Sequence, residues 1–246
     1  MALHIAWRYS HYLHQQHGAL ADLPQLIASN QALWQQALPN EYPLPHIIRY
    51  DEAVPTPCGP LTKGFFYCPV AQSIYLDNRQ LQQLWRFSEA GTFAIAYLLA
   101  HQVAHHLQRL LGIQTQVKTL QQKHPQAQKL ATLLELQADC LAGVWGYYAD
   151  INGLINPKKL KTGLRLASSM QALQPTKMAI IGEQYQHATP ALRQYWFERG
   201  FRFGKLSLCN PFHQSTQQDN PPPQTPAENE LPLNQATIER LLKPAL

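Results

Sequence analysis

The sequence predicts a mainly α-helical (α+β) fold, with one domain over residues 1–212 and a tail over residues 213–246. Three observations lead to this prediction. Segments with helical apolar periodicity dominate residues 88–201. Strand-like runs occur only within residues 46–77, so the β element is small and precedes the longest helices. The chain has 246 residues, 45% of them hydrophobic, which is enough for one sizeable core.

The first third of the chain predicts one helix and two or three short strands. Residues 1–38 are expected to be helical because their apolar positions fall on one face. HIIRY at 46–50 predicts a short strand, and a stretch dense in Pro and Gly follows at 54–64. FFYC at 65–68 and SIYL at 73–76 flank a proline break, which predicts a hairpin or a small sheet.

A long helix is predicted to begin at Ser88, with Ser88 as its N-cap, and to end at Gly112. Residues 113–127, rich in Gln and Lys, are interpreted as a polar connection. Further helices are predicted over residues 128–149, from Pro157 to Leu173, and from Thr189 onward with Pro190 in its first turn.

The tail changes in character after Phe212. Residues 213–232 have almost no large apolar side chains and are rich in Pro, Gln and Asn, so they predict a disordered linker. The last residues, 234–246, predict a short amphipathic tail helix of one or two turns.

The charge distribution argues against nucleic-acid binding. The formal net charge is +5 and the pI is about 9.0, but a nucleic-acid binder concentrates its basic residues more strongly. The densest basic cluster is interpreted as a solvated helix face, with a docking patch as the alternative. It consists of Lys158, Lys159, Lys161 and Arg165.

The compartment is expected to be cytoplasmic. No stretch reaches the roughly 18–20 apolar residues that span a bilayer. The first residues have neither an apolar signal core nor a small-residue cleavage site. Four cysteines favour a different location, since two disulfides would suit an oxidising compartment better. They are Cys58, Cys68, Cys140 and Cys209.

The segment AHQVAHHLQ carries the strongest chemical signal. His101 and His105 are four residues apart on a predicted helix, so both imidazoles lie on one face, one turn apart. Two neutral imidazole nitrogens in this arrangement can approach one Zn²⁺ at about 2.0–2.1 Å.

The following long helix carries two carboxylates, Glu135 and Asp139, which are again one turn apart and interrupt an apolar run. Carboxylates in such a buried stripe must be neutralised. A metal ion held together with the opposing histidines would neutralise them. The alternative is a structural salt bridge, with His106 or Arg109 as the partner.

The pattern H-x-x-x-H followed by E-x-x-A-D resembles the gluzincin metallopeptidases, and the chain resembles the bacterial neutral zinc metallopeptidases in particular. The resemblance covers about residues 32–212, and several spaced motifs carry it. These are Cys58-Gly59, Phe66-Tyr67-Cys68-Pro69, Tyr75-Leu76-Asp77, Glu135 through Trp145, and a terminal block with His187, Arg193, Trp196-Phe197, Arg199-Gly200-Phe201 and Cys209.

This resemblance implies a zincin-like domain with zinc as cofactor and His101, His105 and Glu135 as ligands. It implies that Asp139 orients a ligand histidine through a hydrogen bond. It also gives His187 a contact with substrate or the oxyanion, or else a capping or packing role. The cysteine pairs that the resemblance implies are Cys58 with Cys68 and Cys140 with Cys209.

The chain departs from the family pattern at the general base. Family members have Glu directly after the first histidine, where this chain has Gln102. In the family mechanism that Glu takes a proton from zinc-bound water, and a carboxamide cannot accept it. Other departures are Ala71 for Asp, Ala188 for Gly, and the absence of an acidic pair in residues 167–172.

These departures predict a zinc-binding homologue that has lost peptide hydrolysis or is strongly impaired in it, and that binds a peptide or protein partner. Three alternatives stay open. The chain is an active peptidase with a substitute base such as Asp139, an engineered Glu-to-Gln variant of an active enzyme, or a structural relative that no longer binds zinc. The N-terminal histidines are interpreted as exposed side chains, with an additional metal site as the alternative. They are His4, His11, His14 and His17.

Overall fold

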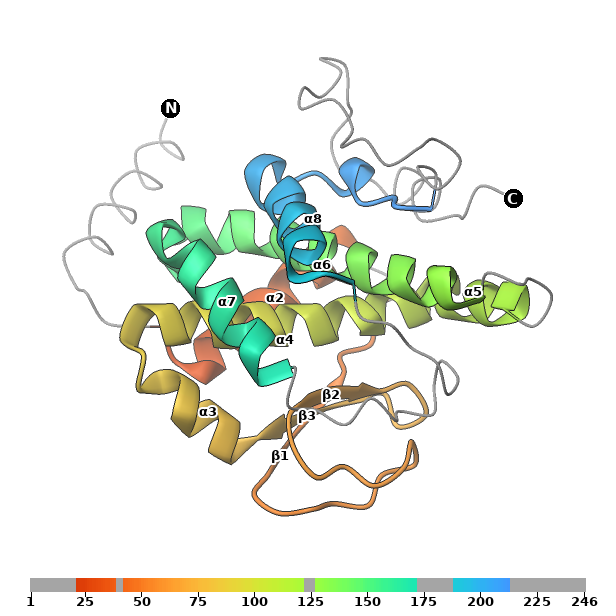
Figure 1. The fold of residues 1–246 in the computed structure, drawn as a ribbon, viewed down its shortest axis with the longest axis horizontal. Helices are drawn as coiled ribbons and strands as arrows, with labels where there is room; N and C mark the ends of the chain where they lie inside the picture. The colour runs from red at the N-terminus through yellow and green to blue at the C-terminus, as the bar shows by residue number, and fades with distance from the viewer. Residues whose placement is uncertain (1–20, 39–41, 122–126, 172–187, 213–246) are drawn as a thin grey trace.

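The computed structural model describes residues 21–38, 42–121, 127–171 and 188–212. Its centre is helix α4 (Ser88–Leu110), with a small sheet on one side and helices α6 and α8 on the other (Figure 1). The mainly helical fold with a small β element is thus confirmed. The predicted tail lies outside the described residues.

The elements follow one another along the chain with short connections. The remaining helices are α2 (Leu23–Ala37), α3 (Asn78–Trp85), α5 (Ile113–Gln121), α6 (Ala127–Ile151), α7 (Leu160–Gln171) and α8 (Pro190–Phe203). The strands are β1 (His46–Tyr50), β2 (Phe65–Cys68) and β3 (Ser73–Asp77), and short 3₁₀ helices cover Pro157–Lys159 and Leu206–Leu208. None of the described helices has the length and hydropathy needed to cross a bilayer.

The sheet has the strand order β1-β3-β2, so β3 is central. Strand β2 pairs antiparallel with β3, with Phe66 opposite Tyr75, and β1 pairs parallel with β3, with His46 opposite Ser73. Every residue of β2 and β3 is buried, because α4 and the loop over residues 51–64 enclose them. The predicted small sheet is therefore confirmed.

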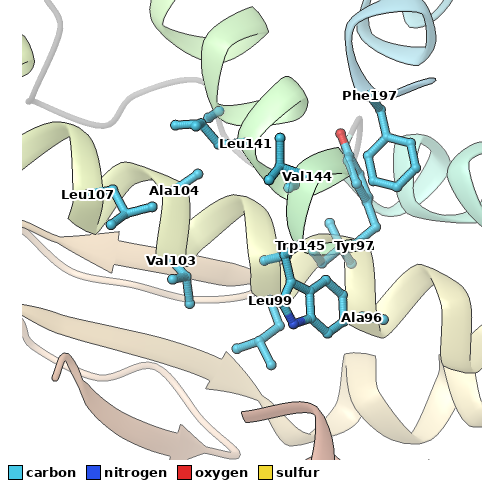
Figure 2. Close-up of a cluster of buried hydrophobic side chains, with 14 of the residues drawn as sticks. Ala96, Tyr97, Leu99, Val103, Ala104, Leu107, Leu141, Val144, Trp145 and Phe197 are labelled. Atoms are coloured by element: carbon cyan, nitrogen blue, oxygen red, sulfur yellow. The ribbon is translucent and has the colours of Figure 1, made fainter. Parts of the chain in front are cut away.

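Helix α4 is buried on nearly all sides, as expected of a helix that is apolar around its whole circumference. Figure 2 shows side chains of α4 and α6 filling the space between these helices, with Phe197 of α8 beside Tyr97 of α4. The rings of Tyr97 and Phe197 meet edge to face, with their centroids 5.3 Å apart. This core holds the two helices that carry the candidate ligands.

Helices α6 and α8 approach each other closely through two glycines. A Cβ atom added at Gly143 would overlap the carbonyl of Phe197, and one added at Gly200 would overlap the carbonyl of Cys140. The disulfide between Cys140 and Cys209 adds a covalent link between α6 and the segment after α8. Helix α8 is thus held tightly against the helix that bears Glu135 and Asp139.

One helix was not predicted, and two local predictions are wrong. Residues 78–85 form helix α3, for which no prediction was made, and its N-cap is Asp77. Ser88 does not cap α4, because its φ of 52° is left-handed and the N-cap is Phe87, which makes no side-chain cap bond. Residues 113–121 form helix α5 instead of a connection, because Ile113 and Val117 lie one turn apart and both side chains are buried in the core.

Other local predictions agree with the structure. Helix α4 ends at Leu110, and the predicted stop residue Gly112 follows the C-cap Leu111 with a left-handed φ of 73°. Thr189 caps α8 through a hydrogen bond from the N–H of Leu192, with Pro190 in the first turn. The basic cluster near the start of α7 is largely exposed, and Lys159 lies 3.7 Å from Glu89.

Candidate metal centre

Helices α4 and α6 bring His101, His105 and Glu135 together. One ligand atom from each residue lies within 4.8 Å of the other two. The two histidine Nε2 atoms are 3.0 Å apart, and the Glu135 oxygens are 3.1 Å from His101 and 3.3 Å from His105. Neighbouring ligands of a tetrahedral zinc ion are separated by about 3.3 Å when each lies at about 2.0–2.1 Å from the metal. The spacing therefore fits a zinc ion.

Hydrogen bonds fix the tautomers of both histidines. The Nδ1 of His101 is 2.9 Å from Oδ1 of Asp139, and the Nδ1 of His105 is 2.9 Å from Oε1 of Gln108. Both partners are acceptors, so each neutral imidazole carries its proton on Nδ1 and offers a bare Nε2.

Three acceptors therefore converge without a donor between them: two Nε2 atoms and the carboxylate of Glu135. His101 is 1% exposed, so bulk water cannot separate them there. Such a group needs a proton or a cation at its centre. This donor set suits Zn²⁺, which histidine nitrogen and glutamate oxygen bind well.

Gln108 orients His105 because its own amide orientation is fixed. Its Nε2 donates to the carbonyl oxygen of Leu134 at 2.8 Å and to Oε1 of Gln137 at 3.0 Å. Both N–H groups are thereby used, so its Oε1 faces His105. Sequence reasoning missed this residue, although it stands three positions after His105 on the same helix, where side chains meet.

Asp139 is fully buried and holds His101 in place within a larger network. Arg193 of α8 binds both oxygens, Nε to Oδ2 and Nη2 to Oδ1, each at 2.8 Å. Tyr97 donates its hydroxyl to Oδ1 at 2.6 Å. The neutralising partner is thus Arg193, and the salt bridge considered with His106 or Arg109 is not formed.

The electrostatics of the cluster keep both carboxylates ionised. Burial raises the pKa of Asp139, but Arg193 and His101 outweigh burial and hold the pKa below its usual value. Burial likewise raises the pKa of Glu135, yet His105 and His101 hold it well below the usual range. Burial lowers the pKa of His101, and the two carboxylates raise it further than burial lowers it. The site therefore presents two fixed negative charges.

Gln102 is 6% exposed and lies against the sheet. Its Oε1 accepts a hydrogen bond of 2.8 Å from the backbone N–H of Tyr67 on β2. A backbone N–H can only donate, so the amide oxygen must face the strand. The remaining group of the amide, its NH₂, is a donor only.

The neighbouring His106 has a different role from the two candidate ligands. Its Nδ1 lies 2.9 Å from the hydroxyl of Tyr67, and its Nε2 lies 2.7 Å from the carbonyl oxygen of Pro43. Since Pro43 can only accept, His106 donates from Nε2 and accepts from Tyr67 at Nδ1. It therefore ties α4 to the sheet and to the segment before β1.

Both cysteine pairs implied by the resemblance are present, Cys58 with Cys68 and Cys140 with Cys209. The first lies beside a cavity of about 670 Å³ that opens next to His105. His187 lies outside the described residues, as do the four N-terminal histidines, so the structure does not place them.

A His-His-Glu set on two packed helices is the protein ligand set of catalytic zinc in several peptidases. Fold and site together define a mainly helical protein with a candidate metal centre whose three residues match that ligand set. The family model described as "putative neutral zinc metallopeptidase" matches residues 11–212. The chain belongs to this family.

Two relatives illustrate the similarity. The chain is 33% identical over 201 residues to the uncharacterized protein YpfJ of Escherichia coli (strain K12), covering 77% of this chain and 70% of that protein. It is 35% identical over 201 residues to the uncharacterized protein Rv2575 of Mycobacterium tuberculosis, covering 75% and 67% respectively. No solved structure matches significantly.

Proposed function

We propose that this protein is a zinc-binding metallopeptidase homologue that has lost peptide hydrolysis, or retains very little, and binds a peptide or protein ligand at its metal centre. One observation carries the proposal. The candidate ligands His101, His105 and Glu135 are complete, whereas the residue in the position of the general base, Gln102, points its only acceptor oxygen at Tyr67.

Zinc bound in such a site lowers the pKa of a coordinated water and polarises a substrate carbonyl. The protein must then remove a proton from the nucleophile and deliver it to the leaving amine. A carboxamide has no basic atom for this task, and the Gln102 oxygen is already engaged by a backbone N–H. Gln102 can only donate from its NH₂, which orients a ligand without moving a proton. General acid–base catalysis contributes about 10²- to 10⁴-fold, so its absence predicts a severe loss.

The first alternative is an active peptidase with Asp139 as a substitute base. Asp139 is poorly suited, because Arg193 binds both of its oxygens and Tyr97 and His101 bind Oδ1 as well. Its side chain is 0% exposed, which leaves no room for a water molecule. These contacts favour a positioning role for Asp139 toward His101.

The second alternative is a relative that no longer binds zinc. The spacing of the three ligand atoms, which fits a zinc ion, favours the metal centre over a protonated histidine paired with Glu135. The decisive measurement is the metal content of protein purified without chelator or added zinc. We expect about one zinc ion per chain, lost in His101→Ala. Zinc-free protein that takes up no supplied zinc would refute the metal centre.

Restoring the base tests the loss of hydrolysis. Gln102→Glu keeps one oxygen for the Tyr67 N–H and supplies a second, basic oxygen. We expect it to raise zinc-dependent cleavage of a peptide library by about 10²- to 10⁴-fold. Gln116→Glu, an exposed change on α5, is the matched control and should stay inactive. Cleavage by the unchanged protein at a similar rate would instead support the substitute-base alternative. An engineered origin of Gln102 predicts the same rescue.

The cytoplasmic location expected from the sequence remains a prediction. The two disulfides favour an oxidising compartment instead, because cytosolic thiols are kept reduced. Alkylation of the cysteines in intact cells before and after reduction would distinguish the two locations.

A further inference from the structure

The cavity beside His105 is lined by the two segments around the Cys58–Cys68 disulfide and by helices α4, α5 and α6, the last through Leu134. The segments next to the Cys58–Cys68 disulfide supply Pro57, Pro69 and Val70. Helix α4 supplies His105 and Arg109, and α5 supplies Val117 and Lys118. The walls are thus largely apolar, and the polar groups lie at defined positions, as in typical ligand sites.

Besides His105, the ionisable side chains that line this cavity are positively charged. Arg109 and Lys118 line it, and no aspartate or glutamate is among its described lining residues. The charged side chains that line the cavity, Arg109 and Lys118, therefore favour an anionic group at their end of it.

Arg109 lacks a partner within the described part of the protein. The residue is half-buried and lies near Tyr67 and His106, and among the described residues it forms no hydrogen bond or ion pair. A guanidinium whose donors have no protein acceptor can bind a carboxylate through two parallel hydrogen bonds. Arg193 shows the contrast, since both oxygens of Asp139 satisfy it.

The position of Arg109 relates this cavity to the metal centre. Arg109 stands four residues after His105, one turn further along α4, which is an axial rise of about 6 Å. An extended peptide advances about 3.3–3.6 Å per residue. A carboxylate held by Arg109 would therefore lie one to three residues from a group bound at the metal centre.

We propose that this cavity binds a carboxylate of a peptide ligand, with Arg109 as the main anchor and Lys118 as a second cation at the rim. This assignment rests on the proposed function, since it names the ligand class of the same site. The carboxylate belongs either to an acidic side chain or to the C-terminus of the peptide, and both supply the same chemistry.

Peptide hydroxamates test the proposal on zinc-loaded protein, because a hydroxamate binds zinc and the attached dipeptide reaches the cavity. The probes are succinyl hydroxamates of Ala-Ala with a free carboxylate, Ala-Ala amide, Ala-Asp amide and Ala-Asn amide. We expect one acid to bind about tenfold more tightly than its neutral counterpart, as for a charge-assisted hydrogen bond. The pair that differs identifies the source of the carboxylate.

Variants locate the effect. Arg109→Gln should reduce the preference for the acid to about one, and Lys118→Gln should reduce it by a smaller factor because Lys118 is exposed. Arg165→Gln, an exposed arginine on α7 outside the cavity, is the matched control and should keep the full preference. Arg109→Glu should reverse the preference toward the Ala-Lys amide probe. Equal binding of acid and amide by the unchanged protein would overturn the proposal.

The two proposals fail in different ways. If the metal centre is misassigned, the neutral hydroxamates bind no better to the protein than to His101→Ala. The N-acetylated dipeptides lack the hydroxamate, so their binding then still measures the affinity of the cavity alone. Their acids should bind more tightly than their amides, with the same dependence on Arg109. Absence of any preference in both series would refute the carboxylate site whatever the outcome at the metal.

Discussion

Arg193 and Asp139 form a two-point ion pair across α8 and α6, with both N–O distances at 2.8 Å. Asp139 in turn holds the Nδ1 of His101, so Arg193 of α8 acts on the candidate ligand His101 through Asp139. The pair depends on the close approach of α6 and α8 at Gly143 and Gly200. The orientation of His101 therefore depends on how closely α6 and α8 pack.

Arg193→Met should destabilise the protein and weaken zinc binding. It leaves the buried carboxylate of Asp139 without its main partner, which typically costs about 3–5 kcal/mol. Loss of a residue that orients a ligand typically reduces metal affinity by about 10- to 100-fold. Urea unfolding and competition with a zinc indicator measure the two effects. Arg165→Met is the exposed control, and an unchanged zinc affinity in Arg193→Met would show that Asp139 orients His101 unaided.

Gly200→Ala should separate α8 from α6. The added methyl group overlaps a backbone carbonyl, which cannot rotate away, so we expect a loss of at least about 2–3 kcal/mol in the free energy of unfolding. Gly146→Ala on α6 is the control, because the nearest atoms to its methyl group belong to the side chains of Phe201 and Phe197 and not to backbone. The two variants should differ clearly in urea denaturation, and equal losses would contradict the close backbone contact.

The two disulfides should contribute unequally to stability. Replacing Cys140 and Cys209 by alanine opens a loop with a sequence separation of 69, whereas the Cys58–Cys68 pair closes one of 10. Loop-closure entropy predicts losses of about 4 kcal/mol and about 3 kcal/mol, respectively. Denaturant titrations of the two double variants, each with the other disulfide intact, provide the comparison. A larger loss for the short loop would mean that native-state contacts around it dominate.

Zinc should stabilise the folded protein. At a free zinc concentration of about 100 times Kd, binding adds about 2.7 kcal/mol, which corresponds to a rise in Tm of about 5–10 °C for a domain of this size. Calorimetry with and without zinc measures the rise. His101→Ala should abolish it, whereas His46→Ala, an exposed change on β1, should preserve it. A rise that persists in His101→Ala would place the stabilising zinc elsewhere.

The long buried elements were predictable because their patterns are local. The apolar circumference of α4, its glycine stop, and the Thr189–Pro190 start of α8 are all visible in short stretches of sequence. Helix α5 was missed because only Ile113 and Val117 face the core, which is too few apolar positions for a clear periodicity. Ser88 was misread because the tight turn from α3 into α4 gives it a left-handed backbone that no local pattern indicates.

The candidate site was predictable only where its residues share a helix. The one-turn spacings of His101 with His105 and of Glu135 with Asp139 identify two faces, and the structure brings those faces together. Arg193 lies 54 residues from Asp139, and no spacing rule joins such distant positions. The orientation of the Gln102 amide also depends on a strand brought close only by folding.

The hydrogen bond between Gln102 and Tyr67 places residue 102 in the contact between α4 and the sheet, almost fully out of water. A carboxylate in that position is costly to desolvate, whereas a hydrogen-bonded amide is much less so. At position 102 a glutamate would favour catalysis, whereas a glutamine favours the stability of the fold. A protein freed from the need to cleave peptides gains robustness from this glutamine, and Gln102→Glu should unfold at a lower urea concentration even as it regains a base.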